Sequence, residues 1–384
     1  MHSAMKINTR ISFALLSFFS NFANGMRGIY IIGGMLLLLM VSCNRQREDD
    51  RASEGDTIQM KYAENLTMVR FADRVEVTLK DPWHEGRELR KYVVQGTPFS
   101  RCVVFNTAHT SLLQMLGALD NVKGVADLKY MNLSEVKKRV GEGRIVDCGD
   151  SMNPDIERIV EMGADAIWLS PFENSGGYGK LEKLGVPLIE CADYMETSAL
   201  GRAEWMRFYG LLVGREHEAD SLFAVVEKSY LQQKRLAHEG KTGRFVLTER
   251  LTGSVWYVPG GRSSMGRLLQ DANARYAWAD DDHSGSLPLS FETVLDKAGD
   301  ADIWVFNYAG KEALTYNRLA AEHHGYGQLK AFKTHNVYYV NSLQVPYFEE
   351  VSFRPDWLLE DYVKLLNSEH PQRENLRYLR RVER

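Results

Sequence analysis

The chain is poor in cysteine and carries none of the short signatures of common enzyme classes. Of its four cysteines, three follow the N-terminal region, namely Cys102, Cys148 and Cys191. An odd and widely spaced set is neither a disulfide framework nor a zinc site, so we expect three small buried residues. The Gly-x-Ser-x-Gly, His-Glu-x-x-His and Cys-x-x-Cys patterns are absent. No local motif therefore indicates hydrolytic or dithiol chemistry.

A concentration of positive charge is also missing. The formal net charge is −4, and Lys and Arg form no stripe along the sequence. Proteins that bind nucleic acid usually carry such a basic patch, so nucleic acid is not expected as the main partner. With 384 residues the chain is too long for one ordinary hydrophobic core. We therefore expect two domains with additional segments.

The N-terminus has the organisation of a targeting segment. Arg27 precedes an apolar stretch that ends in the sequence MVSC, and this stretch is too short for a comfortable membrane span. The ending resembles a bacterial lipobox, in which Cys43 would be the lipidated first residue of the mature protein. We interpret residues 1–43 as a signal peptide with its true start at Met26; an uncleaved membrane anchor is the alternative. The polar residues 44–60 are typical of a flexible tether.

The clearest positive feature is a unit that occurs twice. Residues 153–169 and 288–305 share a glutamate, a pair of aliphatic residues, an acidic residue, a turn of small residues and an Ile-Trp strand. Glu157 and Glu292 align, each near the start of a predicted short helix. Two such copies far apart in one chain predict two similarly built lobes. A two-lobed α/β protein binds its ligand in the crevice between the lobes.

Changes of pattern along the chain predict its architecture. Alternating polar and apolar residues indicate a β-hairpin or meander in 61–100, and strand–helix alternation follows in 101–200 and again in 241–370. Between them, one helical stripe without proline predicts a long helix over 201–240. The basic tail 371–384 is expected at the surface. The fold class is therefore α/β, with two Rossmann-like lobes built on parallel sheets, joined by one long helix and preceded by the meander.

Side chains that can recognise a ligand follow several predicted strands, where open parallel sheets bind small molecules. The candidates from both lobes are His109, Phe172, Tyr178, Trp256, Arg262, Ser263 and Arg354. Aromatic residues on strand-end loops suit a flat ligand, and the glycine-rich stretch around Arg262 can bind carboxylate or phosphate groups. Structural alternatives are a helix-terminal histidine at His109, a plain turn at Arg262 and an ion pair at Arg354.

Together these features resemble a known family, the periplasmic substrate-binding proteins of ABC importers for iron–siderophore complexes, haem and vitamin B12. The resemblance rests on NPDIERIVEMGADAIWLSPFE, WYVPGGRSS and LPLSFETVLDKAGDADIW within residues 100–367. It implies that Glu157 and Glu292 bind arginines of a permease dimer, because two carboxylate–arginine contacts set the register on a symmetric partner. It also implies a monomeric, non-enzymatic protein of the cell envelope, without a cofactor of its own, that binds an iron chelate or a corrinoid.

Two alternatives stay open. A zinc- or manganese-binding importer component has a similar architecture but needs three or four His, Asp or Glu ligands in one cleft. The histidines here are scattered, and His323 and His324 are adjacent. An enzyme on a nitrogenase-like two-lobed scaffold would need cluster-binding cysteines, of which the mature chain has three after Cys43. Resemblance of fold alone does not decide among these functions.

Overall fold

The computed structural model describes residues 55–84, 86–173, 177–239, 243–367 and 375–383. The predicted signal peptide, its start at Met26 and the lipidation site Cys43 lie outside these residues. Within them, no helix is both long enough and apolar enough to cross a membrane. Contacts divide the chain into two units: one holds most of an N-terminal sheet, and the other holds segments 60–66 and 79–90 and everything from residue 98.

The N-terminal sheet has four strands. In the spatial order β1-β2-β3-β4 they are β1 (Asp56–Ile58), β2 (Leu66–Arg70), β3 (Val75–Lys80) and β4 (Glu88–Val94). Alternate residues of β2 and β3 are buried, which is the pattern of a sheet with one covered face. The predicted meander is thus present. The tether predicted over 44–60 is wrong at its end, because β1 pairs antiparallel with β2 and places Thr57 opposite Val69.

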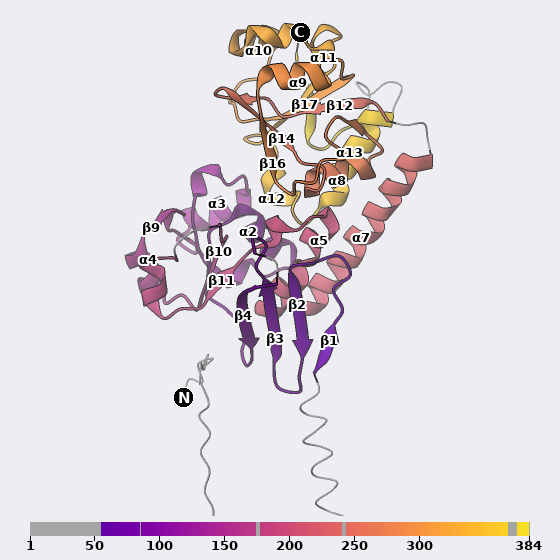
Figure 1. The fold of residues 1–384 in the computed structure, drawn as a ribbon. Helices are drawn as coiled ribbons and strands as arrows, with labels where there is room; N and C mark the ends of the chain where they lie inside the picture. Colours follow the sequence, from indigo (N-terminus) through magenta and orange to yellow (C-terminus); the bar gives the residue numbers. More distant parts are fainter. Residues whose placement is uncertain (1–54, 85, 174–176, 240–242, 368–374, 384) are drawn as a thin grey trace, which may run out of the picture. The chain divides into compact units, whose positions relative to one another are not determined.

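The N-terminal lobe is built on a five-stranded parallel sheet, of which Figure 1 labels β10 and β11. In the spatial order β11-β10-β5-β6-β7 its strands are β5 (Cys102–Val104), β6 (Val122–Val125), β7 (Val146–Asp147), β10 (Ala166–Leu169) and β11 (Leu188–Glu190). Every residue of β5 and β10 is buried, so both faces of the sheet are covered there. The prediction of a parallel α/β lobe is confirmed. Cys102, Cys148 and Cys191 are buried free thiols, as expected.

Short helices connect these strands. They are α2 (Thr107–Met115), α3 (Ser134–Gly141), α4 (Ile156–Glu161) and the 3-10 turns η1 (Leu119–Asn121), η2 (Leu128–Tyr130), η3 (Leu181–Leu184) and η4 (Asp193–Met195). The repeated unit starts at Asn153, three residues before α4 begins. Asn153–Pro154 forms β9, which pairs with β8 (Gly149–Asp150). The helix is capped instead by Asp155, whose carboxylate accepts a hydrogen bond from the Arg158 amide at 3.2 Å.

The single helix predicted over 201–240 is interrupted. The structure has α5 (Ala199–Glu204), α6 (Met206–Leu212) and the 24-residue α7 (Glu216–Glu239), which Figure 1 shows as one continuous helix. The break lies at Gly214, whose φ of +69° falls in the left-handed region that favours glycine. Next to it the Arg215 carbonyl lies so near Gly210 that a Cβ there would be 2.7 Å from the oxygen. The long connecting helix is therefore α7 alone.

The C-terminal lobe contains a second five-stranded sheet, in the spatial order β15-β12-β17-β18-β19. Strands β12 (Phe245–Thr248), β15 (Arg275–Tyr276), β17 (Ile303–Tyr308) and β18 (Val337–Asn341) are parallel, and β19 (Leu379–Arg381) is antiparallel to β18. The prediction of a surface tail over 371–384 is wrong for its described part. The buried carboxylate of Asp361 holds this segment by accepting hydrogen bonds from the amides of Arg377 and Tyr378, both at 2.7 Å.

Helices and a small antiparallel sheet complete the C-terminal lobe. The helices are α8 (Ser264–Asp271), α9 (Phe291–Ala298), α10 (Tyr316–Glu322), η5 (His324–Gln328), α11 (Lys330–Lys333), α12 (Tyr347–Glu350) and α13 (Pro355–Asn367). The small sheet, in the order β13-β14-β16, consists of β13 (Leu251–Thr252), β14 (Val255–Pro259) and β16 (Ser286–Leu289). Helix α13 packs against the connecting helix α7.

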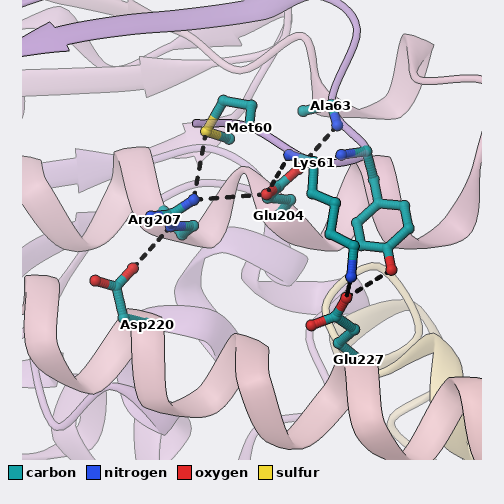
Figure 2. A network of polar contacts seen from close by, with 8 residues as sticks. Met60, Lys61, Ala63, Glu204, Arg207, Asp220 and Glu227 are labelled. Atoms are coloured by element: carbon teal, nitrogen blue, oxygen red, sulfur yellow. Dashed lines mark hydrogen bonds and ion pairs between the residues drawn. The ribbon is translucent and has the colours of Figure 1, made fainter. Parts of the chain in front are cut away.

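Glutamates attach the segment before β2 to the connecting helices (Figure 2). Glu204, at the end of α5, is 1% exposed. Its carboxylate accepts hydrogen bonds from three successive backbone amides, those of Lys61 (2.8 Å), Tyr62 (2.7 Å) and Ala63 (2.9 Å). Glu227 of α7, which is half-buried, binds the Lys61 amine and the Tyr62 hydroxyl. The backbone of residues 61–63 is thus held by one carboxylate, and two of its side chains are held by another.

Replacing Glu204 by alanine should leave those three amides without an acceptor. We expect a loss of about 2–4 kcal/mol in the free energy of unfolding by denaturant, since each buried donor left unpaired costs about 1–3 kcal/mol. Limited trypsin digestion should also cleave faster after Lys61. Glu161→Ala, at an exposed position of α4, is the matched control and should change neither quantity. Unchanged stability of Glu204→Ala would contradict the role assigned to this carboxylate.

Candidate ligand-binding site

The carboxyl ends of three parallel strands of the N-terminal lobe border a cavity of about 790 Å³. Asn106 lies just beyond β5, Asp127 lies just beyond β6, and Phe172 lies just beyond β10. This is the edge of an open parallel sheet at which small molecules bind. The volume falls within the range of about 300–1,000 Å³ that is typical of small-molecule sites.

The lining of this cavity is mostly uncharged, and three large side chains are exposed in it. Tyr130, Met152 and Phe172 are 67%, 76% and 47% exposed. Asp127 and Lys180 are the charged side chains of the lining and have opposite sign. Because grouped exposed apolar side chains mark binding surfaces, the cavity suits a flat, largely uncharged molecule better than a polyanion.

A second cavity of about 230 Å³ shares Asn106, Ser170 and Phe172 with the first. Phe172 therefore has contact with both spaces. His109 and Arg202 form part of the polar side of the smaller cavity. A ligand that occupies both cavities would meet aromatic side chains in one and charged groups in the other.

The polar side of the smaller cavity is a network centred on Asp193, which is 0% exposed. Its carboxylate contacts His109 Nε2 at 2.7 Å, the Tyr209 hydroxyl at 2.8 Å and Arg202 Nε at 3.1 Å. Burial lowers the pKa of His109, whereas its neighbours Cys191 and Asp193 raise it, and the net pKa is about 10. Burial raises the pKa of Asp193, whereas His109, Arg202 and Tyr209 lower it to about 2. At neutral pH the histidine and the aspartate are therefore a buried ion pair.

Arg202 has hydrogen-bond donors beyond those that the network uses. Only its Nε contacts Asp193, and its two Nη groups have no protein partner within the described ranges. The side chain is 26% exposed and borders the smaller cavity. A guanidinium in this position can bind a carboxylate, amide or phosphate oxygen of a ligand.

The structure brings the three predicted residues of the N-terminal lobe to these cavities. His109 is 2% exposed, so its ring supports the wall through Asp193 rather than covering a large ligand surface. Tyr178 lines the larger cavity, and its hydroxyl donates to Glu190 at 3.1 Å. Arg90 binds the same Glu190 oxygen at 2.6 Å. Phe172 is the exposed aromatic residue between the two spaces.

The prediction that Trp256 stacks on a ligand requires a correction. Its side chain is 0% exposed, and its ring packs against Phe291, Trp304 and Tyr326. The indole Nε1 donates to the Thr248 carbonyl at 2.9 Å. Trp256 lies on the covered face of β14 and is a core residue, so no face of its ring is available to a ligand.

The other candidates of the C-terminal lobe have local roles or lie at another cavity. Ser263 caps α8, because its hydroxyl accepts a hydrogen bond from the Gly266 amide at 3.0 Å. Arg354 pairs with Asp356 at 2.9 and 2.7 Å, which is the structural alternative to a ligand contact. Arg262 is exposed and borders a separate cavity of about 490 Å³ whose lining includes residues of α7. These three residues therefore do not line either cavity of the N-terminal lobe.

Sequence reasoning missed several residues of the site. Asp193 comes three residues after the end of β11, so its strand-end position was a usable signal. Tyr130 and Met152 lie on connections after β6 and β7, where the sequence shows no periodic pattern. Arg202 lies inside a stretch interpreted as one helix and gave no local sign of its role. Its partner Asp193 is nine residues away, across the start of α5.

The two copies of the repeated unit occupy equivalent places in their sheets. Helix α4 leads into β10, which pairs with the first lobe strand β5, and α9 leads into β17, which pairs with the corresponding strand β12. Glu157 and Glu292 are each the second residue of their helix and are exposed. Ile156, next to Glu157, lines the larger cavity. The first of the two glutamates therefore lies near the ligand-binding edge.

Comparisons with known proteins agree with this fold. A family described as periplasmic binding protein matches residues 102–342. An uncharacterised lipoprotein of Methanocaldococcus jannaschii is 25% identical over 325 residues, which are 82% of this chain and 76% of that protein. The structure of an ABC-type Fe³⁺-hydroxamate transport system from Saccharomonospora viridis has a TM-score of 0.57 at 18% identity and covers 75% of this chain and 98% of its own. A periplasmic haem-binding protein from Pseudomonas aeruginosa has a TM-score of 0.58 at 14% identity, and the match covers 74% of this chain and 98% of that protein.

Over the described ranges, no group of three or more His, Cys, Asp or Glu side chains is placed to hold a metal ion. The adjacent rings of His323 and His324 stack on each other with an interplanar angle of 13°.

The opposite pKa shifts of His109 and Asp193 predict a particular dependence of stability on pH. The contribution of His109 is present below its ordinary pKa of 6.5 and is lost as the pH rises through about 10. The contribution of Asp193 is present above its ordinary pKa of 3.8 and is lost as the pH falls through about 2. Unfolding free energy should therefore decline between neutral and alkaline pH.

His109→Gln should remove the alkaline decline that belongs to this pair and should destabilise the protein by about 3–5 kcal/mol at neutral pH, because a buried charge loses its partner. Denaturant unfolding at a series of pH values measures both effects. His238→Gln, at an exposed position of α7, is the control. The same pH profile in wild type and His109→Gln would contradict the ion pair.

Proposed function

The chain belongs to the periplasmic binding protein family, and from this premise we propose that it is the substrate-binding component of an ABC importer. It captures an iron complex, as a siderophore or haem, or cobalamin, and delivers it to a membrane permease dimer. The observation that carries the proposal is the equivalent placement of Glu157 and Glu292 in two sheets of related strand order. Two matching carboxylates suit a partner that presents two matching arginines.

The cavities support a ligand with a flat apolar surface and a polar edge. Tyr130, Met152 and Phe172 offer exposed apolar contact area in the larger space. Arg202 offers, in the smaller space, two Nη groups that have no partner among the described residues. A haem or a corrinoid has both features, since each combines a broad macrocycle with carboxylate or amide side chains. The function is binding and release rather than catalysis.

The proposed location is the cell envelope, with the protein anchored to a membrane by lipid at Cys43. The order of Arg27, an apolar stretch and a cysteine supports this anchor. The relative from Methanocaldococcus jannaschii is named a lipoprotein, which also supports it. We propose that the protein acts there as a monomer, with no cofactor of its own.

Absorbance and fluorescence titrations of the purified protein against haemin, cobalamin and a panel of ferric siderophores test the proposed ligand class. We expect saturable binding of one of these compounds. Binding of free Zn²⁺ or Mn²⁺ with no binding of any chelate would favour the metal-importer alternative instead.

Phe172→Ala should weaken ligand binding by about 1–3 kcal/mol, because an aromatic side chain that contacts both cavities would lose its stacking surface. This corresponds to an increase in Kd of about five- to 150-fold. Tyr257→Ala removes an aromatic side chain of similar exposure, 46%, from β14 and is the matched control. Equal affinities of the Phe172 variant and the wild type would remove this residue from the site.

Glu157→Arg and Glu292→Arg should impair uptake of the ligand while its affinity for the purified protein stays unchanged. Each substitution removes a charge-assisted contact with the permease and introduces like-charge repulsion. The controls are Glu161→Arg on α4 and Asp296→Arg on α9, which reverse exposed charges on the same two helices. Normal uptake by both glutamate variants, or equal loss in the controls, would reject the docking role.

A further inference from the structure

The end of strand β12 in the C-terminal lobe carries a strained glutamate. Glu249 has a φ of +59°, a left-handed conformation that is costly for a residue with a side chain. Its backbone is held on both sides, because its amide donates to the Val305 carbonyl at 2.8 Å and its carbonyl accepts from Trp304 Nε1 at 2.6 Å. Asn307 Nδ2 donates to its carboxylate at 3.3 Å.

Two further oxygen atoms at the same place receive no hydrogen bond. Thr248 is 2% exposed, and its Oγ1 lies beside the Tyr276 hydroxyl. That hydroxyl donates to the Pro259 carbonyl at 2.6 Å, so Thr248 Oγ1 accepts no hydrogen bond from the residues that the structure describes. Asn307 Oδ1 also accepts no hydrogen bond from the described residues. The Nδ2 of the same amide is the atom that donates to Glu249. Thr248, Glu249 and Asn307 line one cavity of about 10 Å³. Such a volume holds about one water-sized particle.

The Glu249 carboxylate forms no ion pair in the described part of the chain, although the charge of Arg250 acts to lower its pKa. The adjacent Arg250 forms its ion pair with Glu322 instead. Burial raises the pKa of Glu249, which reflects the cost of removing its charge from water. A desolvated carboxylate beside two unpaired oxygens is costly unless a positively charged particle or a proton donor joins them.

We propose that Thr248, Glu249 and Asn307 bind a single monovalent cation of about the size of Na⁺. Ligands that are all oxygen favour hard cations over transition metals. One carboxylate balances one positive charge. Beside a single carboxylate, Ca²⁺ or Mg²⁺ would keep one positive charge unbalanced in a buried space. The ion would link the ends of the neighbouring strands β12 and β17.

Thermal unfolding of the purified full-length protein in NaCl and in choline chloride tests the site. Choline matches the ionic strength but is too large for the cavity. At about 0.2 M salt and about pH 8 we expect Tm to be about 2–4 °C higher in NaCl, since a ligand that binds only the folded state raises its stability. Glu249→Gln should abolish this difference, and Glu161→Gln, an exposed control, should retain it.

A proton competes with the cation for the same carboxylate. The pKa of Glu249 is raised in the folded state, so protonation of this carboxylate stabilises the folded protein at low pH. That contribution to the unfolding free energy is lost as the pH rises through the folded-state pKa. The Na⁺ effect should therefore be larger at about pH 8 than at about pH 5. Burial raises the pKa of the nearby hydroxyls of Tyr276, Tyr347 and Tyr362, so they stay neutral in this range. The guanidinium of Arg250 is the adjacent cationic group.

Equal Tm values in the two salts at both pH values would overturn the proposal and assign the space to water or a proton. Persistence of the Na⁺ effect in Glu249→Gln would overturn it as well. The comparison of salts in the wild type needs no variant, so it decides the question even if Glu249→Gln fails to fold. Asn307→Asp offers a second carboxylate and should increase the Na⁺-dependent rise in Tm; a smaller rise would count against the site.

Discussion

A carboxylate removed from water must be bound by donors, and in this chain that requirement joins segments that are far apart in the sequence. Glu204 binds the backbone of the segment that starts at Lys61, and Asp361 binds the backbone that leads into β19. Asp193 binds a histidine, a tyrosine and an arginine from three different elements. An unpaired buried charge costs several kcal/mol. Arrangements of the chain that break one of these contacts are therefore less stable.

The same requirement separates two kinds of residue at the candidate ligand-binding edge: those that support the cavity wall and those that are exposed to the cavities. Asp193 and His109 bind each other inside the wall through the carboxylate and Nε2, so this contact needs no ligand. His109 Nδ1 is buried without a hydrogen-bond partner among the described residues. Arg202 uses one donor in this network and keeps two that border the cavity. Phe172 has no role in the network and is 47% exposed. The network thus orients a charged group at the surface, while the apolar side chains beside it remain open to contact.

Much of this fold was predictable because its signals are local. The buried strands β5, β10 and β12 are short apolar runs, and the repeated unit shows which helix precedes which strand. Contacts between distant residues were not predictable: Asp193 lies 84 residues after His109, and no pattern connects them. Trp256 illustrates a second limit. It alternates with the exposed Tyr257 along β14, and only the packing of the small sheet shows which of the two faces the core.

The two lobes share a four-strand order, β6-β5-β10-β11 in one and β15-β12-β17-β18 in the other, but use their carboxyl edges differently. After β5 the chain enters α2 directly, whereas after β12 it first forms β13 and β14, which β16 joins later in the sequence as a small sheet. This insertion packs Trp256 against Trp304 of β17, so the aromatic side chains there belong to the core. The repeated helices keep a common geometry because each returns antiparallel to its strand and begins at the carboxyl edge. Glu157 therefore lies beside the cavity that Ile156 lines, so a permease bound to it, as proposed above, would be near a ligand in that cavity.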